Sequence, residues 1–336
     1  MDDAAPVKVS DIAPVNAPWV WLGRDQSRRD DWIVEMTSTE VDELLAAAKS
    51  AAGCPLDELT PQNFPLPKLS KTLANLREQV SWGRGFGLLR GLPIHELPAD
   101  QIKTVFCGVG AHLGVSVSQS ADSDRLGDVI DRGGTDRYYT RGGALEFHMD
   151  PVDVVGLLCL RAAVEGGASR IVSSMAIHNI LREEAPDILA TLYNGFHNSR
   201  RGFGEATRDE MIPMYIDGAR RVECYHLPIT IRQADEEGFK ITPDEQKALD
   251  MVAEVAARPD VYLDMHFQEG DIQFLNNRTV LHARTDYVDH PDPALKRHLL
   301  RLWLMMDDWP DRAGAQNFRA ASGDRAGGGI KPAKDK

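Results

Sequence analysis

Two motifs in which an aspartate follows a histidine by two residues occur in the chain. In the first, His148 and Asp150 stand at the end of a strand predicted over 144–149, and alternate residues of a strand point to the same face. An imidazole nitrogen and a carboxylate oxygen would then project together, as two ligands of one metal ion must. The second motif, His290 with Asp292, lies in a stretch rich in Pro and Asp that indicates a turn, so we interpret it as a chance occurrence.

A third histidine and two arginines follow far downstream. An apolar strand predicted over 271–276 leads through a polar turn to His282, and a strand predicted over 298–306 carries Arg301, with Arg297 just before it. Burying an arginine in an apolar strand is unfavourable unless an anion pairs with it. Two interpretations stay open: a bound anionic ligand, or a structural Asp or Glu partner or an edge strand whose arginines face water.

His148, Asp150 and His282 together form a ligand set that leaves coordination positions open on a metal ion. Such a set suits non-haem Fe(II) and oxygen chemistry. The planar guanidinium of an arginine matches a carboxylate with two parallel hydrogen bonds. Open iron positions and a carboxylate clamp indicate a bidentate 2-oxo acid as co-substrate.

Four motifs resemble those of the taurine dioxygenase (TauD/TfdA) family of Fe(II)/2-oxoglutarate-dependent oxygenases. They are EFHMD at 146–150, EGGASR at 165–170, NNRTVLH at 276–282 and RHLLR at 297–301. The resemblance extends from Gly87 to Trp303 and implies a double-stranded β-helix, or jelly roll. It also implies Fe(II) as the metal, with 2-oxoglutarate and dioxygen as co-substrates and succinate and CO2 as products.

The resemblance implies roles for individual residues. His148, Asp150 and His282 are similar to the family's iron ligands. Related halogenases replace the metal-binding carboxylate by a small residue, which opens a site for a halide. This chain keeps Asp150, so hydroxylation or another oxidative outcome is favoured over halogenation.

The co-substrate residues also follow from the resemblance. Arg301 resembles the arginine that binds the distal carboxylate of 2-oxoglutarate, and Arg297 resembles a supporting arginine. Ser169 stands where the family has a threonine that bonds the same carboxylate. The loop after His282 is longer than in the taurine enzyme, so either arginine remains a candidate for the direct clamp. Arg284 is a third candidate, for which we favour a position at the rim.

The primary substrate is less well defined by the sequence. Family substrates are mostly small acids, amino acids and related compounds, which implies a small acidic or amino-acid-like substrate. Candidate lining residues near the first two ligands are Tyr138, Tyr139 and Phe147. Two further candidates, Arg200 and Arg201, lie in the loop 198–204. A tyrosine pair is more often packing than a substrate wall, and an arginine pair in a loop is more often solvated than an anion site.

The elements that must position these residues are mainly short strands. Beside a strand at 85–92, β-branched segments bounded by Gly, Pro and Asp predict strands over 126–131, 144–149, 152–160, 169–174, 222–232, 261–267, 271–276 and 298–306. Helical spacing predicts helices over 39–52 (with Thr39 as N-cap), 69–82, 99–113, 175–193 and 242–257. The expected fold is mainly β with α: a jelly-roll core braced by N-terminal and inserted helices.

Composition defines the domain and the partners that we expect. The 336 residues predict an extended arm over 1–35, a single oxygenase domain over 36–311 and a disordered tail over 312–336. A net charge of −13 disfavours nucleic acid as a partner. No signal peptide and no apolar run of roughly 20 residues is present, so we expect no membrane partner. Four scattered cysteines indicate reduced thiols and a cytoplasmic location, and a homo-oligomer is left open.

Two other classes of protein remain to be excluded. A cupin-type hydrolase or isomerase would use the same histidines and aspartate for Zn or Mn, but it would have no use for a buried Arg301. A catalytically silent binding module on this fold would be expected to lose a metal ligand or the arginine clamp, and this chain keeps both.

Overall fold

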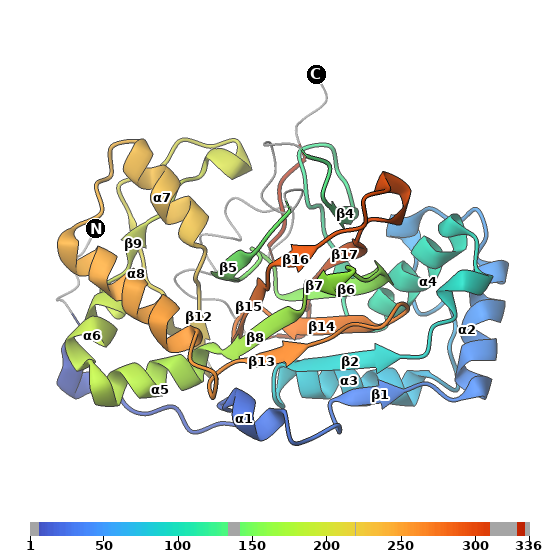
Figure 1. Ribbon diagram of the computed structural model, residues 1–336, viewed down its shortest axis with the longest axis horizontal. Coiled ribbons are helices and arrows are strands. Elements are labelled where there is room, and N and C mark those ends of the chain that lie inside the picture. The colour runs from blue at the N-terminus through green and yellow to red at the C-terminus, as the bar shows by residue number, and fades with distance from the viewer. Residues whose placement is uncertain (1–6, 134–141, 219, 310–327, 333–336) are drawn as a thin grey trace.

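Two β-sheets packed face to face form the centre of the molecule (Figure 1). The computed structural model describes residues 7–133, 142–218, 220–309 and 328–332. In order across the larger sheet, the strands are β1 (Ile33–Glu35), β2 (Phe86–Arg90), β14 (Ile272–Asn276), β6 (Val154–Arg161), β17 (His298–Met305) and β3 (Val115–Ser116), with β4 (Leu126–Ile130) also paired to β17. The smaller sheet runs β13 (Leu263–Met265), β8 (Ser169–Ser173), β15 (Val280–Arg284) and β5 (Leu145–His148).

All the pairings within these two sheets are antiparallel except that of β1 with β2. Three two-stranded ribbons extend from them: β7 (Glu165–Gly166) with β16 (Tyr287–Val288), β9 (Phe196–His197) with β10 (Met211–Ile212), and β11 (Tyr215–Asp217) with β12 (Val222–Cys224). This architecture confirms the predicted mainly β fold with a jelly-roll core.

Helices cover the outer faces of both sheets (Figure 1). On the larger sheet lie α2 (Ser38–Ser50), α3 (Ser70–Ser81) and α4 (Ala99–Ala111), whose Leu73 and Phe106 pack in one buried cluster with Phe274 of β14. On the smaller sheet lie α5 (Ser174–Glu184), α6 (Pro186–Asn194), α7 (Pro228–Glu236) and α8 (Pro243–Ala256), and Val252 of α8 shares a cluster with Leu281 of β15. The short α1 (Gly23–Gln26) lies in the N-terminal arm. Within the described residues, no helix is both long enough and apolar enough to cross a membrane.

The alternation of side chains along β17 explains how charged groups enter the centre of the sandwich. Leu300 and Leu302 face the N-terminal helices and join the cluster there. The intervening Arg301 and Trp303 therefore point to the opposite face, between the two sheets. The period of two that buries the leucines thus also buries the arginine.

The N-terminal arm lies along the inserted helices and is held by side chains. The amide of Asn179 accepts from the Val15 N–H at 2.9 Å and donates to the Val15 carbonyl at 2.7 Å. The hydroxyl of Ser173 donates to the carbonyl of Trp19 at 2.6 Å. In the predicted tail, residues 328–332 are described: Gly328 forms an isolated bridge with Val152, and the rest of 312–336 lies outside the described residues. The boundaries of the arm, domain and tail stay predictions.

Three secondary-structure predictions were wrong in detail. The strand predicted over 222–232 ends at residue 224, and α7 begins at Pro228, since a proline is favourable in the first turn of a helix. The helix predicted over 175–193 is two helices, because Pro186 disfavours a helical conformation at the residue before it, where φ is −149°. The N-cap of α2 is Thr37, which forms a capping box with Glu40, and not Thr39.

Candidate active site

The three residues predicted to bind metal come together between the sheets. His148 ends β5, His282 lies in the middle of β15, and the two residues are direct partners across the strand pair. Their rings are 4.3 Å apart between centroids, and Asp150 follows in the turn after β5. One donor atom from each of the three residues lies within 4.8 Å of the other two. No other cluster of this kind occurs among the residues that the structure describes.

A hydrogen bond of His148 and the burial of His282 suit these two histidines to bind a metal ion. The Nδ1 atom of His148 donates to the carbonyl of Glu146 at 2.8 Å, so Nε2 is the nitrogen that would bind a metal ion. Burial lowers the pKa of His282 to about 3, with a further contribution from the nearby His148, so its imidazole is neutral at physiological pH. Its Nδ1 atom is buried and has no hydrogen-bond partner among the described residues. Neutral imidazole is the form that binds metal.

The carboxylate of Asp150 is buried but charged. Burial alone would raise the pKa of Asp150, but the charge of the nearby Arg301 holds it below its usual value. Its Oδ2 atom accepts from the indole N–H of Trp303 at 2.9 Å, and its backbone N–H donates to Oδ1 of Asn277 at 3.1 Å. The site therefore offers an ionised oxygen ligand in a defined orientation, which together with two imidazole nitrogens fits a divalent transition metal.

A small cavity of about 50 Å³ opens beside this cluster. Its walls carry three arginines, whereas Asp150 is the one acidic residue in the lining. Besides His148, Asp150 and His282, the polar residues of the lining are Ser169, Arg284, Arg297 and Arg301. The excess of positively charged residues in this lining favours an anion over a cation as the occupant of the cavity.

Arg301 differs from the expected clamp because its guanidinium is directed at a carboxylate of the protein itself. Its Nη1 atom lies 3.3 Å from Oδ1 of Asp150, and its Nε donates to Oε1 of Gln119 at 2.8 Å. The side-chain amide of Gln119 in turn donates to the carbonyl of Arg301 at 2.9 Å. Arg301 thus contacts the candidate metal ligand directly.

Arg297 forms no ion pair with a carboxylate in the described part of the chain. It is 5% exposed, and its Nη2 atom donates to the carbonyl of Gly167 at 3.2 Å. Burial, together with repulsion from Arg284, lowers the pKa of Arg297 to about 10, so it is still charged at neutral pH. Within the described ranges, no carboxylate lies within ion-pair distance of its guanidinium. A buried cation in this state favours an anionic ligand.

Ser169 and Arg284 complete the polar wall. The hydroxyl of Ser169 donates to Oε1 of Gln273 at 3.1 Å. Arg284 donates from Nε to the carbonyl of Gly143 at 2.9 Å and lies 4.9 Å from the ring centre of Tyr287. It lines both the small cavity and a larger neighbouring pocket, which agrees with the rim position favoured from the sequence.

The larger pocket has a volume of about 510 Å³ and is lined by β5, β15, α7 and α8. It shares Leu145, Ala283 and Arg284 with the small cavity, so the two are neighbours. Phe147, a predicted substrate residue, lies in its wall, as does Arg232.

Other predicted substrate residues lie elsewhere. Arg200 is 2% exposed and ion-paired with Glu205, and Arg201 contacts Glu236 on the surface. Neither arginine lines either pocket. Tyr138 and Tyr139 lie outside the described residues.

The second His-x-Asp motif forms a turn, as we interpreted it. The Nδ1 atom of His290 accepts from the backbone N–H of Asp292, whose carboxylate caps the short helix Pro293–Leu295. Neither residue belongs to the metal-capable cluster.

Two functional contacts of the site were missed by sequence reasoning. Trp303 stands two residues after Arg301 on the same strand, so the period of two was a usable signal that it shares the inner face. Gln119 lies in a loop with no recognisable motif, and its contact with Arg301 depends on tertiary packing.

Comparison with known proteins gives consistent matches. Residues 50–303 match the model of the family described as "Taurine catabolism dioxygenase TauD, TfdA family". FR-33289 synthase of Streptomyces rubellomurinus is 31% identical over 310 residues, covering 88% of this chain and 91% of that protein. A taurine hydroxylase-like protein of Stachybotrys chartarum is 30% identical over 318 residues, covering 88% of this chain and 80% of that one.

Two solved structures share the fold at low identity. An asparagine oxygenase in complex with Fe(II), 3-hydroxyasparagine and succinate has a TM-score of 0.68 at 16% identity, covering 89% of this chain and 99% of that one. The non-haem iron oxygenase OrfP in complex with Fe and alpha-ketoglutaric acid has a TM-score of 0.63 at 14% identity, covering 89% and 98%. The match over residues 50–303 and the two relatives at 30% identity or more lead to one conclusion: the chain belongs to the TauD/TfdA family of dioxygenases.

Proposed function

We propose that this protein is an Fe(II)- and 2-oxoglutarate-dependent oxygenase that oxidises a small acidic or amino-acid-like molecule, with release of succinate and CO2. One observation carries the proposal. A cluster of two imidazoles and one carboxylate opens directly onto a cavity whose walls hold three arginines and only one acidic group.

Iron would be held by His148, Asp150 and His282. Two nitrogens and one oxygen suit Fe(II) and leave open positions for other ligands. When bound, Fe(II) would supply the binding and activation of dioxygen. The protein contributes the protonation states: His282 is kept neutral by burial, and Asp150 is kept ionised by Arg301.

2-Oxoglutarate would be held by Arg297 at its distal carboxylate. Arg297 lacks a carboxylate partner within the described part of the chain, whereas Arg301 faces Asp150. The geometry therefore favours Arg297 over Arg301 as the direct clamp, one of the two assignments that the motifs left open. Ser169, in the wall of the same cavity, would add a neutral hydrogen bond.

The primary substrate would occupy the larger pocket, with Phe147 in its wall and Arg284 where the two pockets meet. The amino-acid part of the proposal is supported by the relatives. The asparagine oxygenase structure contains 3-hydroxyasparagine, and an OrfP structure contains (3S)-hydroxy-L-Arg. We also propose a cytoplasmic location, which the four free cysteines support.

The proposal is tested by measuring succinate. Purified protein with Fe(II), 2-oxoglutarate and dioxygen is offered a library of small acids and amino acids. A substrate should stimulate succinate formation and should gain one oxygen atom derived from labelled dioxygen. The Asp150→Ala variant serves as the control and should form no product. Turnover with Zn(II) or Mn(II) in the absence of 2-oxoglutarate would instead support the cupin-type alternative.

A further inference from the structure

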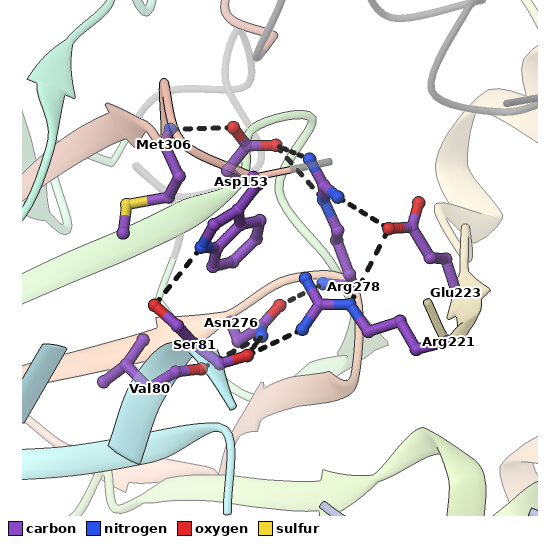
Figure 2. A network of polar contacts seen from close by, with 9 residues as sticks. Val80, Ser81, Asp153, Arg221, Glu223, Asn276, Arg278 and Met306 are labelled. Carbon is purple, nitrogen blue, oxygen red and sulfur yellow. Dashed lines mark hydrogen bonds and ion pairs between the residues drawn. The ribbon is translucent and has the colours of Figure 1, made fainter. Parts of the chain in front are cut away.

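A buried ionic network joins segments that are far apart in the chain (Figure 2). Its centre is Arg278, which is fully buried in the turn between β14 and β15. The Nη2 atom of Arg278 donates to Oδ1 of Asp153 at 2.9 Å, and its Nη1 donates to Oε1 of Glu223 at 2.6 Å. Figure 2 shows the guanidinium between the two acids, which come from distant parts of the chain. Both acids are themselves buried.

One arm of the network reaches the turn that carries Asp150. Asp153 stands three residues after Asp150, and its Oδ2 atom accepts from the backbone N–H of Met306 at 2.9 Å. The neighbour of Arg278, Asn277, holds both ends of this turn. Its Oδ1 atom accepts from the Asp150 N–H at 3.1 Å, and its own N–H donates to the Asp153 carbonyl at 2.9 Å.

The other arm reaches the segment that flanks His148. The carbonyl of Arg278 accepts from the Cys224 N–H at 2.8 Å, next to Glu223. Two residues further on, the carbonyl of His226 accepts from the Met149 N–H at 2.9 Å. Arg278 therefore ties the segment 149–153 to the segment 222–226.

We infer that Arg278 is a positioning residue that acts through Asp153 and Asn277 to hold the carboxylate of Asp150 in place for a divalent cation. The inference rests on the proposed function, since it assumes that the cluster binds metal. Arg278 lines neither pocket, so it has no contact with a ligand there. Outer partners of this kind typically change metal affinity by about 10- to 100-fold when they are removed.

A merely structural role is the alternative, and the chain offers a matched control. Arg90 and Asp271 form another arginine–aspartate pair, with both hydrogen bonds at 2.8 Å and with Asp271 1% exposed. Neither residue lines the two pockets or contacts the metal-capable cluster. Asp271→Asn and Asp153→Asn each remove the negative charge of a buried aspartate that pairs with an arginine.

The experiment compares these two variants with the wild type in three measurements. Mn(II) affinity is measured by titration, the free energy of unfolding by urea, and amide hydrogen exchange over 149–153 in the metal-free protein. Asp153→Asn should weaken Mn(II) binding by about 10- to 100-fold and speed exchange in that segment. Asp271→Asn should destabilise the fold but leave Mn(II) affinity and this exchange within about twofold of the wild type.

A double variant tests whether Arg278 acts through Asp153. Combining Arg278→Lys with Asp153→Asn should weaken Mn(II) binding no more than the stronger single change, because both changes break the same bridge. Should Asp153→Asn fail to fold, Glu223→Gln takes its place. This variant keeps the acceptor oxygen and removes one charge from the partners of Arg278.

The outcomes separate the inference from the proposed function. If the wild-type protein binds no Mn(II), the proposed function itself fails. If the wild type binds Mn(II) and Asp153→Asn binds it equally well, or if both Asn variants lose affinity in proportion to their stability, Arg278 has only a structural role. In those two cases the inference is overturned while the proposed function stands.

Discussion

The Nη1 atom of Arg301 lies 3.3 Å from the Oδ1 atom of Asp150, so a buried arginine is paired with the carboxylate of the metal-capable cluster. Four residues earlier, Arg297 is also buried but has no carboxylate partner among the described residues. The two arginines of this motif thus have different partners. Arg301 pairs with the carboxylate of Asp150, and we propose that Arg297 binds an anion.

Replacing Arg301 with Met should therefore lower the affinity for Fe(II), and not the affinity for 2-oxoglutarate alone. The expected loss in Fe(II) affinity is about 10- to 100-fold, because the oriented and charged state of Asp150 depends on this contact. Anaerobic titration with Fe(II) measures it. A variant with unchanged Fe(II) affinity and a large loss in 2-oxoglutarate affinity alone would contradict the assignment and restore Arg301 as the clamp.

The sequence was sufficient to predict the three residues of the metal-capable cluster. It was not sufficient to assign separate roles to Arg297 and Arg301. His148 and Asp150 were found because their spacing in a strand is interpretable, and His282 because it follows an apolar strand and a polar turn. The choice between Arg297 and Arg301 depends on the pairing of Arg301 with Asp150, which lies far away in the chain and contacts the arginine only in the fold.

The two His-x-Asp motifs give a matched pair of variants. Asp150→Ala should abolish Fe(II) binding at concentrations that saturate the wild type, because it removes the one carboxylate of the cluster. Asp292→Ala removes only the cap of a short surface helix and should leave Fe(II) binding intact. Isothermal titration on both folded variants decides the matter. Loss of Fe(II) binding in Asp292→Ala would show that the wrong motif was chosen.

The fold was predictable where a single period dominates the sequence. Strands such as β14 and β17 alternate or bury all their residues, and α2 and α3 show a clear apolar face, so their positions were correct to within a few residues. The segment after Cys224 was misassigned because its β-branched residues favour a strand. In the structure, Pro228 begins a helix there, and Ile231 is buried with the inserted helices.

A methyl group at Gly167 should disturb the clamp. Gly167 has φ +66°, and a Cβ there would lie 3.0 Å from Nε of Arg297. Gly167→Ala should cost about 1–2 kcal/mol of stability from backbone strain and also weaken 2-oxoglutarate binding. Gly53, at φ +85° with nothing within 4 Å of an added Cβ, is the control. Gly53→Ala should lose stability from backbone strain without a change in 2-oxoglutarate affinity. Equal co-substrate affinity in both variants would argue against Arg297.

A buried histidine makes the stability of the fold depend on pH. Burial lowers the pKa of His178, which hydrogen-bonds Tyr193 and Asn179 beneath the N-terminal arm. Because the folded-state pKa lies below the unfolded value, the stabilisation is complete above about pH 6.5 and is lost progressively as the pH falls below it.

His178→Gln should therefore reduce the difference in unfolding free energy between pH 7.5 and pH 5, as measured with urea. His95→Gln, at a side chain that is 77% exposed, should leave that difference unchanged. The interpretation is wrong if the two variants show the same pH dependence as the wild type.

The most direct test of the proposed function is the anaerobic addition of 2-oxoglutarate to the Fe(II)-loaded protein. Binding is followed through the visible charge-transfer band of the iron–2-oxoglutarate chelate. The wild type should develop the band and saturate. Arg297→Ala should bind Fe(II) normally but require on the order of 30-fold to several thousandfold more 2-oxoglutarate, since removing one partner of a desolvated charge pair costs about 2–5 kcal/mol. Ser169→Ala should cost only about 2- to 12-fold, because a neutral hydrogen bond contributes less. An Fe(II)-loaded wild type that never develops the band, or an Arg297→Ala variant that saturates like the wild type, would contradict the account.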